Sequence, residues 1–200
     1  MTTTKNDRFS IFPCGWWNEK KQKVQMRQSP QQTMTIADVY RYITSERARW
    51  ATETLREMMA TATDEELRKF KVLHFEYATF SGIFSYRNAQ RLAERTPYIT
   101  IDIDHLSSTE EARELQQVFT RDKLVETALC FVSPKGKGVK WVTILPKWLK
   151  DKTWKEQFAG IRQYVGFNYG YDPDPSGSDI SRACFLPWDE NCYINPKFIK

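Results

Sequence analysis

The strongest constraint on the fold is the alternation of strand-like and helix-like patterns in the second half of the chain. Residues 98–104, Tyr-Ile-Thr-Ile-Asp-Ile-Asp, are rich in β-branched residues and predict a strand. Ser108 and Glu111 form a capping-box pattern that opens a predicted helix ending near Phe119. A Gly/Lys turn at 134–138 then joins two further strand-like runs as a hairpin. We therefore expect an α/β (α+β) catalytic core with a mostly antiparallel sheet.

The rest of the chain divides into a polar, helical first part and shorter elements around the core. We predict an N-terminal extension and helical region over 1–72, and the core over 73–200. The first part is predicted to begin with an extended segment or one irregular strand followed by a polar loop to 34, and then to form helices over 35–44 and 45–60 and a helix opened by the capping box Thr63/Glu66. Next come a predicted strand over 75–84 broken by Gly82 and a short helix over 88–95. Further along, the patterns predict strands over 127–133 and 139–145, a helix with the stripe Trp154, Phe158, Ile161 and Val165, a turn-rich loop over 172–178 and a short strand over 181–186.

Cysteine and histidine usage narrows the metal chemistry that is open to the chain. Its four cysteines form no CxxC pair and are expected to be reduced thiols, most of them buried. With only two histidines, a His-rich metal site is excluded. A bound metal would therefore be held mainly by carboxylates, which favours Mg²⁺ or Mn²⁺.

Charge and hydropathy indicate the class of partner. The formal net charge is +5 and the pI about 9.0, values that permit a nucleic-acid partner without proving one. No run approaches the roughly 20 apolar residues of a membrane span, and the polar start does not resemble a signal peptide. We expect a soluble, cytoplasmic protein with no membrane partner.

The first candidate site is the acidic pair Asp102 and Asp104 at the end of the predicted strand 98–104. Side chains two residues apart on a strand share a face, so both carboxylates point the same way and can hold one or two hard cations. Ile101 and Ile103 would face the core. A solvated strand end with two ordinary aspartates is the alternative interpretation.

The second candidate is the turn Ser-Pro-Lys-Gly-Lys-Gly-Val-Lys, residues 133–140. Gly136 and Gly138 allow the backbone to approach a ligand closely, while lysines and the Ser133 hydroxyl can meet phosphate. The turn has neither the spacing nor the following helix of a P-loop. An ordinary solvated hairpin turn is the alternative.

The third candidate is Asp179 with Arg182, where a carboxylate and a guanidinium could serve a metal and a phosphate. A surface ion pair is the alternative. Asp172 and Asp174 lie in a Pro-rich stretch and are interpreted as turn formers. Lysines also gather near the start of the predicted helix that carries the stripe from Trp154 to Val165, namely Lys147, Lys150, Lys152 and Lys155. They are interpreted either as a solvated helix start or as contacts to the template strand.

Taken in order, the segments ITIDIDHL, SPKGKGVKW and DISRACFLPWD resemble the three motifs of the archaeo-eukaryotic primase superfamily. The chain looks especially similar to primase-polymerase-like domains associated with a VirE N-terminal domain in bacterial mobile elements. The segments ATFSGIF and YINP also fit that group, and the resemblance covers roughly residues 70–196.

The resemblance implies an RRM-like catalytic core and a set of site residues. It assigns catalytic and metal-binding roles to Asp102, Asp104 and Asp179, and nucleotide binding to Ser133, Gly136, Lys137, Gly138, Lys140 and Arg182. The sequence departs from the pattern at Lys140, where many members have a histidine that contacts the incoming nucleotide. Lysine keeps a positive charge near phosphate but lacks the imidazole.

The sequence thus predicts a two-metal nucleotidyltransferase of the DNA primase/polymerase type in replication or mobile-element maintenance. Its substrates would be nucleoside triphosphates, its template single-stranded DNA, and a helicase or other replication protein a further partner. Two alternatives stay open: a catalytically reduced module that binds single-stranded nucleic acid, and a metal-dependent nuclease.

Overall fold

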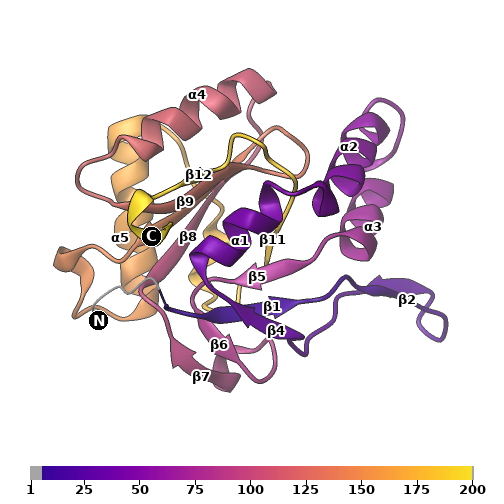
Figure 1. Ribbon diagram of the computed structural model, residues 1–200, viewed down its shortest axis with the longest axis horizontal. Coiled ribbons are helices and arrows are strands. Elements are labelled where there is room, and N and C mark those ends of the chain that lie inside the picture. The colour runs from indigo at the N-terminus through magenta and orange to yellow at the C-terminus, as the bar shows by residue number, and fades with distance from the viewer. Residues whose placement is uncertain (1–5, 200) are drawn as a thin grey trace.

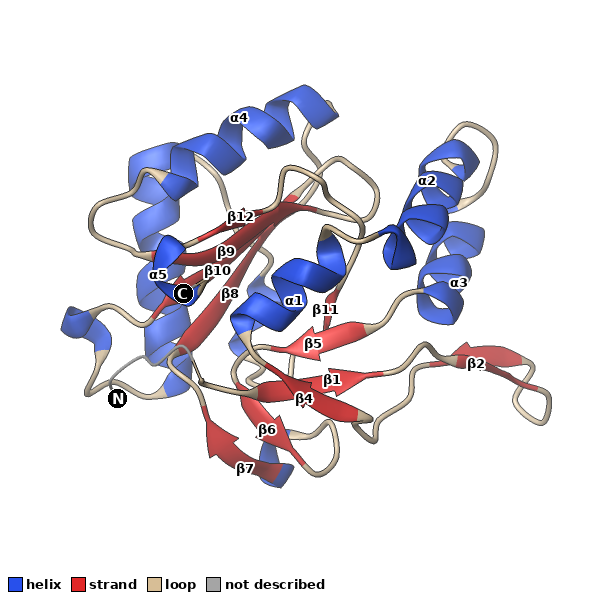
Figure 2. Ribbon diagram, in the orientation of Figure 1, coloured by secondary structure: helices blue, strands red, loops and turns tan. Residues whose placement is uncertain are grey.

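A computed structural model describes residues 6–199, which form two four-stranded antiparallel sheets, two two-stranded antiparallel sheets and five α-helices (Figures 1 and 2). The strands are β1 Phe9–Phe12, β2 Trp16–Asn18, β3 Lys23–Gln25, β4 Gln32–Met34, β5 Tyr77–Thr79, β6 Gly82–Phe84, β7 Leu92–Arg95, β8 Tyr98–Ile103, β9 Thr127–Val132, β10 Val139–Ile144, β11 Cys184–Phe185 and β12 Tyr193–Ile194. The α-helices are α1 Ile36–Ile43, α2 Arg49–Met58, α3 Asp64–His74, α4 Thr109–Thr120 and α5 Trp154–Tyr169. Short 3₁₀ turns include η3 Lys147–Leu149 and η4 Pro175–Ser178. The predicted mixed class with a mostly antiparallel sheet is confirmed.

The second half of the chain forms a four-stranded sheet in the order β12-β9-β10-β8. Its elements follow one another as β8, α4, β9, β10, α5 and β12, which is a β-α-β-β-α-β succession. Helices α4 and α5 cover one face, where Ile101, Phe119, Trp141 and Ile161 are fully buried. The short last strand adds beside β9, so β8 stays at the opposite edge of the sheet.

The other face of this sheet packs against the N-terminal elements. Helix α1 lies between it and a second sheet, ordered β11-β5-β1-β4 (Figure 1). One core cluster contains Phe9 from β1, Val39 from α1, Ala78 from β5 and Phe131 from β9. Strands and core residues from both sides of position 72 thus pack together, and the predicted division of the chain at that position stays a prediction.

Local signals determined most helix ends. Thr35, Thr63 and Thr153 each cap a helix with a reciprocal capping box, and Ser108 caps α4 through the Glu111 backbone N–H. These caps account for the agreement between the predicted and observed starts of four helices. No helix among residues 6–199 is long and apolar enough to cross a membrane.

The prediction of a short helix over 88–95 was wrong. Only Ala89–Arg91 forms a 3₁₀ turn, and the following residues form β7, which pairs with β6. Pairing with a neighbouring strand outweighs the weak helical pattern, because β-structure depends on its partners more than on local propensity. The N-terminal segment also holds four short strands, β1 to β4, where one irregular strand was expected.

Helix α2 is joined to the C-terminal segment by one buried hydroxyl. Thr52 donates to the Ala48 carbonyl at 2.9 Å and accepts the Trp188 backbone N–H at 2.8 Å, and its side chain is fully buried. This bond links the N-terminal helices to the chain that follows β11.

We expect Thr52→Val to lower the free energy of unfolding by about 1–3 kcal/mol, because the variant leaves the Trp188 N–H buried without a partner. Thermal or urea unfolding measures this change. Thr120→Val is the matched control, since that hydroxyl only bonds the Gln117 carbonyl at the helix surface and its loss should change little. Equal effects of the two substitutions would contradict the linking role of Thr52.

Candidate functional site

Asp102 and Asp104 lie at the end of β8 on the face opposite α4 and α5. Ile101 and Ile103 are buried in the core beneath those helices, as the strand alternation predicted. The Asp102 side chain is 18% exposed and that of Asp104 is 42% exposed. The acidic pair therefore stands at the boundary between the core and solvent.

Lys140 is the direct cross-strand neighbour of Asp102, because β10 pairs with β8 in that register. Its Nζ forms a salt bridge with Asp102 and lies 3.5 Å from Asp104 Oδ1. The register of the sheet therefore places a buried ammonium group against both carboxylates.

The third carboxylate at this point is that of Asp174, in the loop before η4. The Asp174 backbone N–H donates to the Asp102 carbonyl at 2.9 Å, which fixes the loop against the end of β8. One oxygen from each of Asp102, Asp104 and Asp174 lies within 4.8 Å of the others. Carboxylate oxygens grouped this closely are a donor set suited to a hard divalent cation.

Asp179, the predicted third acid, lies outside this group. It is exposed, and its Oδ1 accepts bonds from the Ser181 N–H and hydroxyl, both at 2.9 Å, so its carboxylate is turned into its own loop. Asp174 is a turn former, as expected, since it accepts bonds from Ser176 at the start of η4. Asp174 also lies beside the acidic pair, and the sequence analysis missed this role.

The charges of the cluster explain the directions of its pKa shifts. Burial raises the pKa of Asp102, and the carboxylates of Asp104 and Asp174 add to the rise against the opposing Lys140. Burial would lower the pKa of Lys140, but Asp102 and Asp104 outweigh it and hold that pKa above its ordinary value. Lys140 is therefore an ammonium group within a surplus of negative charge, and the cluster favours a further cation.

The 133–138 turn packs directly on the acidic strand end. A Cβ at Gly138 would come within 2.5 Å of the Ile103 carbonyl oxygen and 3.1 Å of Asp104 Oδ1, so only glycine fits this approach. Gly136 has a φ of 79°, a left-handed conformation that suits glycine in the turn. The two predicted glycines thus have specific steric reasons for their positions.

The N-terminal helices hold the turn from the other side. Arg56 of α2 donates through Nε to the Pro134 carbonyl at 3.2 Å, and Lys135 forms a 3.0 Å salt bridge with Asp64 at the start of α3. No pattern in the sequence indicated that α2 and α3 support the predicted phosphate-binding turn.

A single pocket of about 600 Å³ brings most of the predicted site together. We call it the central pocket. Its lining contains six of the predicted residues, namely Asp102, Asp104, Ser133, Lys137, Lys140 and Arg182. The volume lies within the roughly 300–1,000 Å³ typical of ligand sites.

Two further cationic residues, which the sequence analysis did not select, line the central pocket. Lys71 comes from the last turn of α3 and lies 5.8 Å from the Phe185 ring, while Arg87 donates to the Ser181 carbonyl at 3.5 Å. Burial lowers the pKa of Lys71, and the nearby Lys140 and Lys135 lower it further. The one available signal was that Lys71 follows Leu67 by four residues, on the buried side of an amphipathic helix.

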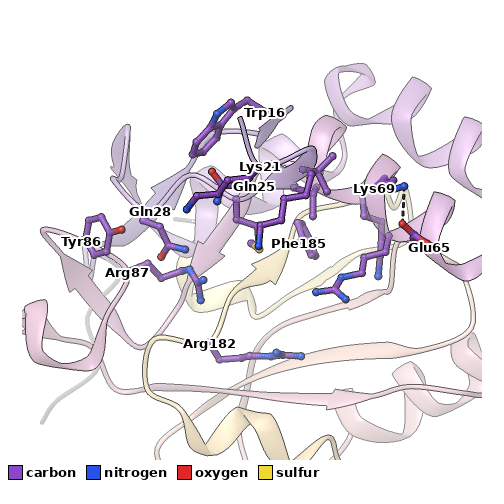
Figure 3. Close-up of a pocket in the computed structure, with 16 residues that line it drawn as sticks. Trp16, Lys21, Gln25, Gln28, Glu65, Lys69, Tyr86, Arg87, Arg182 and Phe185 are labelled. Atoms are coloured by element: carbon purple, nitrogen blue, oxygen red, sulfur yellow. Dashed lines mark ion pairs between the residues drawn. The ribbon is translucent and has the colours of Figure 1, made fainter. Parts of the chain in front are cut away.

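Arg182 connects the central pocket to the acidic cluster. Its Nη2 bonds Asp174 Oδ2 at 2.7 Å, and its half-exposed side chain also lines the pocket. Figure 3 shows Arg182 below Phe185, with Arg87 to one side. Arg182 therefore pairs with a carboxylate at the site, whereas the sequence analysis assigned it to phosphate.

Comparison with known proteins gives one match. A family model described as BT4734-like, N-terminal domain matches residues 71–194, which is more than half of the chain. No match was found among curated proteins or among solved structures. The matched range contains the acidic cluster and the turn, whereas β1 to β4, α1, α2 and most of α3 precede it.

Lys140→Met should lower the free energy of unfolding by about 3–5 kcal/mol in the presence of a chelator, because it leaves the largely buried Asp102 carboxylate without its cation. Added Mg²⁺ or Mn²⁺ should then raise the unfolding temperature of the variant more than that of the wild type. Lys135→Met, which removes a surface partner of Asp64, is the control and should change little. A variant as stable as the wild type would rule out the buried role of Lys140.

Proposed function

The chain belongs to the BT4734-like, N-terminal domain family, and we propose that its central pocket transfers nucleotides from nucleoside triphosphates to a growing strand. The observation that carries the proposal is the meeting of an acidic cluster and a ring of cations in one pocket. A metal-bound triphosphate has matching needs, since its metal binds carboxylates and its phosphates bind lysine and arginine. The protein would act in the cytoplasm as a nucleotidyltransferase of the DNA primase/polymerase type.

The carboxylates and the lysines of the pocket have different roles in the proposed reaction. Mg²⁺ or Mn²⁺, when bound, supplies Lewis-acid activation and neutralises charge on the phosphates. Asp102, Asp104 and Asp174 would hold the cation, and Lys71 and Lys137 would bind the triphosphate from the walls. Because phosphoryl transfer depends mainly on positioning and electrostatics, the protein does not need to supply a nucleophile of its own.

The proposed step is an in-line displacement at phosphorus. The 3′-hydroxyl oxygen of the growing strand forms a new bond to the α-phosphorus, and the bond from that phosphorus to the bridging β-phosphate oxygen breaks. Pyrophosphate leaves with the electron pair, and the hydroxyl proton passes to solvent. A single-stranded DNA template would select the nucleotide, and a helicase or other replication protein is a proposed partner.

A second candidate function rests on Lys140. Its ammonium contacts Asp102 and lies 3.5 Å from Asp104, so it already compensates part of the charge that a metal would neutralise. A chain with this arrangement could bind single-stranded nucleic acid without catalysis. The two functions differ in whether triphosphates are consumed.

Nucleotide incorporation on primed and unprimed single-stranded DNA, with Mg²⁺ or Mn²⁺, tests the proposal. Wild-type protein should give extended products, and Asp102→Asn should reduce them by about 10²–10³-fold or more, as loss of a charge-stabilising group does elsewhere. Binding of the template should survive in the variant. Wild-type protein that binds DNA but extends nothing would favour the non-catalytic module, and shortened DNA would favour a nuclease.

Two isosteric substitutions test whether Asp174 or Asp179 is the third metal-binding carboxylate of the site. We expect Asp174→Asn to weaken Mn²⁺ binding by at least about tenfold, because even groups around metal ligands have effects of that size. Asp179→Asn should leave Mn²⁺ affinity unchanged. Asparagine preserves the local turn at both positions, so calorimetric titration compares the carboxylate charges alone. The reverse order of effects would restore Asp179 as the third acid.

A further inference from the structure

A second, larger cavity lies beside the central pocket, between the β2–β3 hairpin and α3 (Figure 3). Its volume is about 920 Å³, and we call it the basic groove. One wall is the hairpin, which contributes Trp16, Lys21 and Lys23. The opposite wall is α3, held to the hairpin by a 2.7 Å bond from the Gly15 N–H to the Val72 carbonyl.

The charged side chains that line the basic groove are almost all positive. Seven lysine and arginine side chains line it, against one acidic side chain, Glu65. That acid is already paired with Lys69 at 2.7 Å along α3. The cations come from four separate segments of the chain: Lys21 and Lys23 lie on the hairpin, Arg68, Lys69 and Lys71 on α3, and Arg87 and Arg182 on two different later loops. Positive charge collected from elements far apart in the chain is suited to an extended polyanion.

The basic groove and the central pocket adjoin each other. Met26, Lys71, Arg87, Arg182 and Phe185 line both cavities. In Figure 3 Arg87 lies to the left of Phe185 and Arg182 lies below it. A polymer lying in the groove would therefore lie directly beside the pocket that holds the acidic cluster.

Aromatic side chains are interspersed among the cations. Trp16 is 36% exposed and Tyr86 is 47% exposed, and both line the groove with Phe185. The Arg27 guanidinium lies over the Trp16 ring at 5.1 Å, which supports the ring from one side. Exposed aromatic faces beside cations are the combination that stacks unpaired bases while binding their phosphates.

We propose that the basic groove binds single-stranded DNA and leads it to the central pocket. The choice of a single strand follows from the aromatic side chains, because bases within a duplex have no free face to stack on them. The choice of DNA rests on the proposed function, in which the strand is the template. Hairpin β2–β3 lies outside residues 71–194, so this strand path depends on elements beyond the matched family region.

The chain contains a competing basic surface that supplies a matched control. Lys150 and Lys152 are exposed lysines near η3 and the start of α5, and neither lines the groove or the central pocket. Replacing them removes the same charge as replacing Lys21 and Lys23. Nonspecific attraction to a basic protein would respond equally to both pairs.

The test measures fluorescence anisotropy of labelled oligodeoxythymidine, about 12 nucleotides long as suits known single-strand sites. The full chain is used with EDTA and without triphosphates. Lys21→Ala/Lys23→Ala should weaken binding about tenfold and reduce the salt-dependence slope by about 1.4, from a slope of roughly 0.7 per phosphate contact. Lys150→Ala/Lys152→Ala should leave both quantities unchanged. Equal weakening by the two double variants overturns the proposal.

Trp16 tests the stacking part of the proposal. Trp16→Ala should weaken binding about tenfold without changing the salt slope, and Trp16→Phe should restore most of the affinity. Thermal unfolding of each variant checks that the hairpin is intact. Tighter binding of duplex DNA, of RNA of the same length or of anionic lipid vesicles than of the DNA single strand would overturn the assignment.

Failure of this inference is distinguishable from failure of the proposed function. Asp102→Asn should bind the oligonucleotide like the wild type while losing incorporation, whereas the hairpin variants should recover incorporation at saturating template. Incorporation by a wild type whose DNA affinity is insensitive to Lys21, Lys23 and Trp16 would keep the proposed function and reject the groove. Groove-dependent binding without incorporation would do the opposite.

Discussion

The site depends on the cross-strand contact between Lys140 and Asp102. Burying a carboxylate costs several kcal/mol unless a partner offsets it, and β10 supplies that partner because its register places Lys140 opposite Asp102. A shift of β8 by one residue would turn Asp102 into the apolar core beneath α4 and α5 and bring Ile101 or Ile103 to the polar face. The ion pair and the two cores on either side of the sheet therefore specify the same register.

That arrangement produces a pocket with a negatively charged floor and positively charged walls. Three carboxylates gather at the end of β8, while lysines and arginines from α3, the 133–138 turn and the loop after η4 surround them. An anionic ligand alone would be repelled by the carboxylates, and a cation bound alone at the carboxylates would leave the positive walls without a partner. A polyanion that carries its own divalent cation satisfies both groups, and this is the reason for proposing a metal-bound triphosphate rather than either component.

The parts of the fold and site that the sequence predicted are those set by neighbours along the chain. Capping patterns at Thr63 and Ser108 marked helix starts, and the spacing of Asp102 and Asp104 fixed their common face. Asp174 was missed because its place depends on a backbone bond to Asp102 across the fold. Lys71 and Arg87 were missed for a similar reason, since only packing of α3 and of the segment before β7 brings them to the pocket. Strand β7 likewise exists through its pairing with β6.

The first 72 residues account for more of the site than their sequence patterns indicate. Arg56 of α2 bonds the 133–138 turn, and Asp64 at the start of α3 pairs with Lys135 of the same turn. The β2–β3 hairpin forms one wall of a groove that adjoins the central pocket. A net charge of +5 says little about binding until the fold distributes it, and here the fold concentrates seven cations against one paired acid along a single path. Helix α3 takes part in both arrangements, because Asp64 at its start pairs with the turn while Arg68, Lys69 and Lys71 line the groove. In the proposed function this one helix therefore supports the turn and also helps to select the polyanion that reaches it.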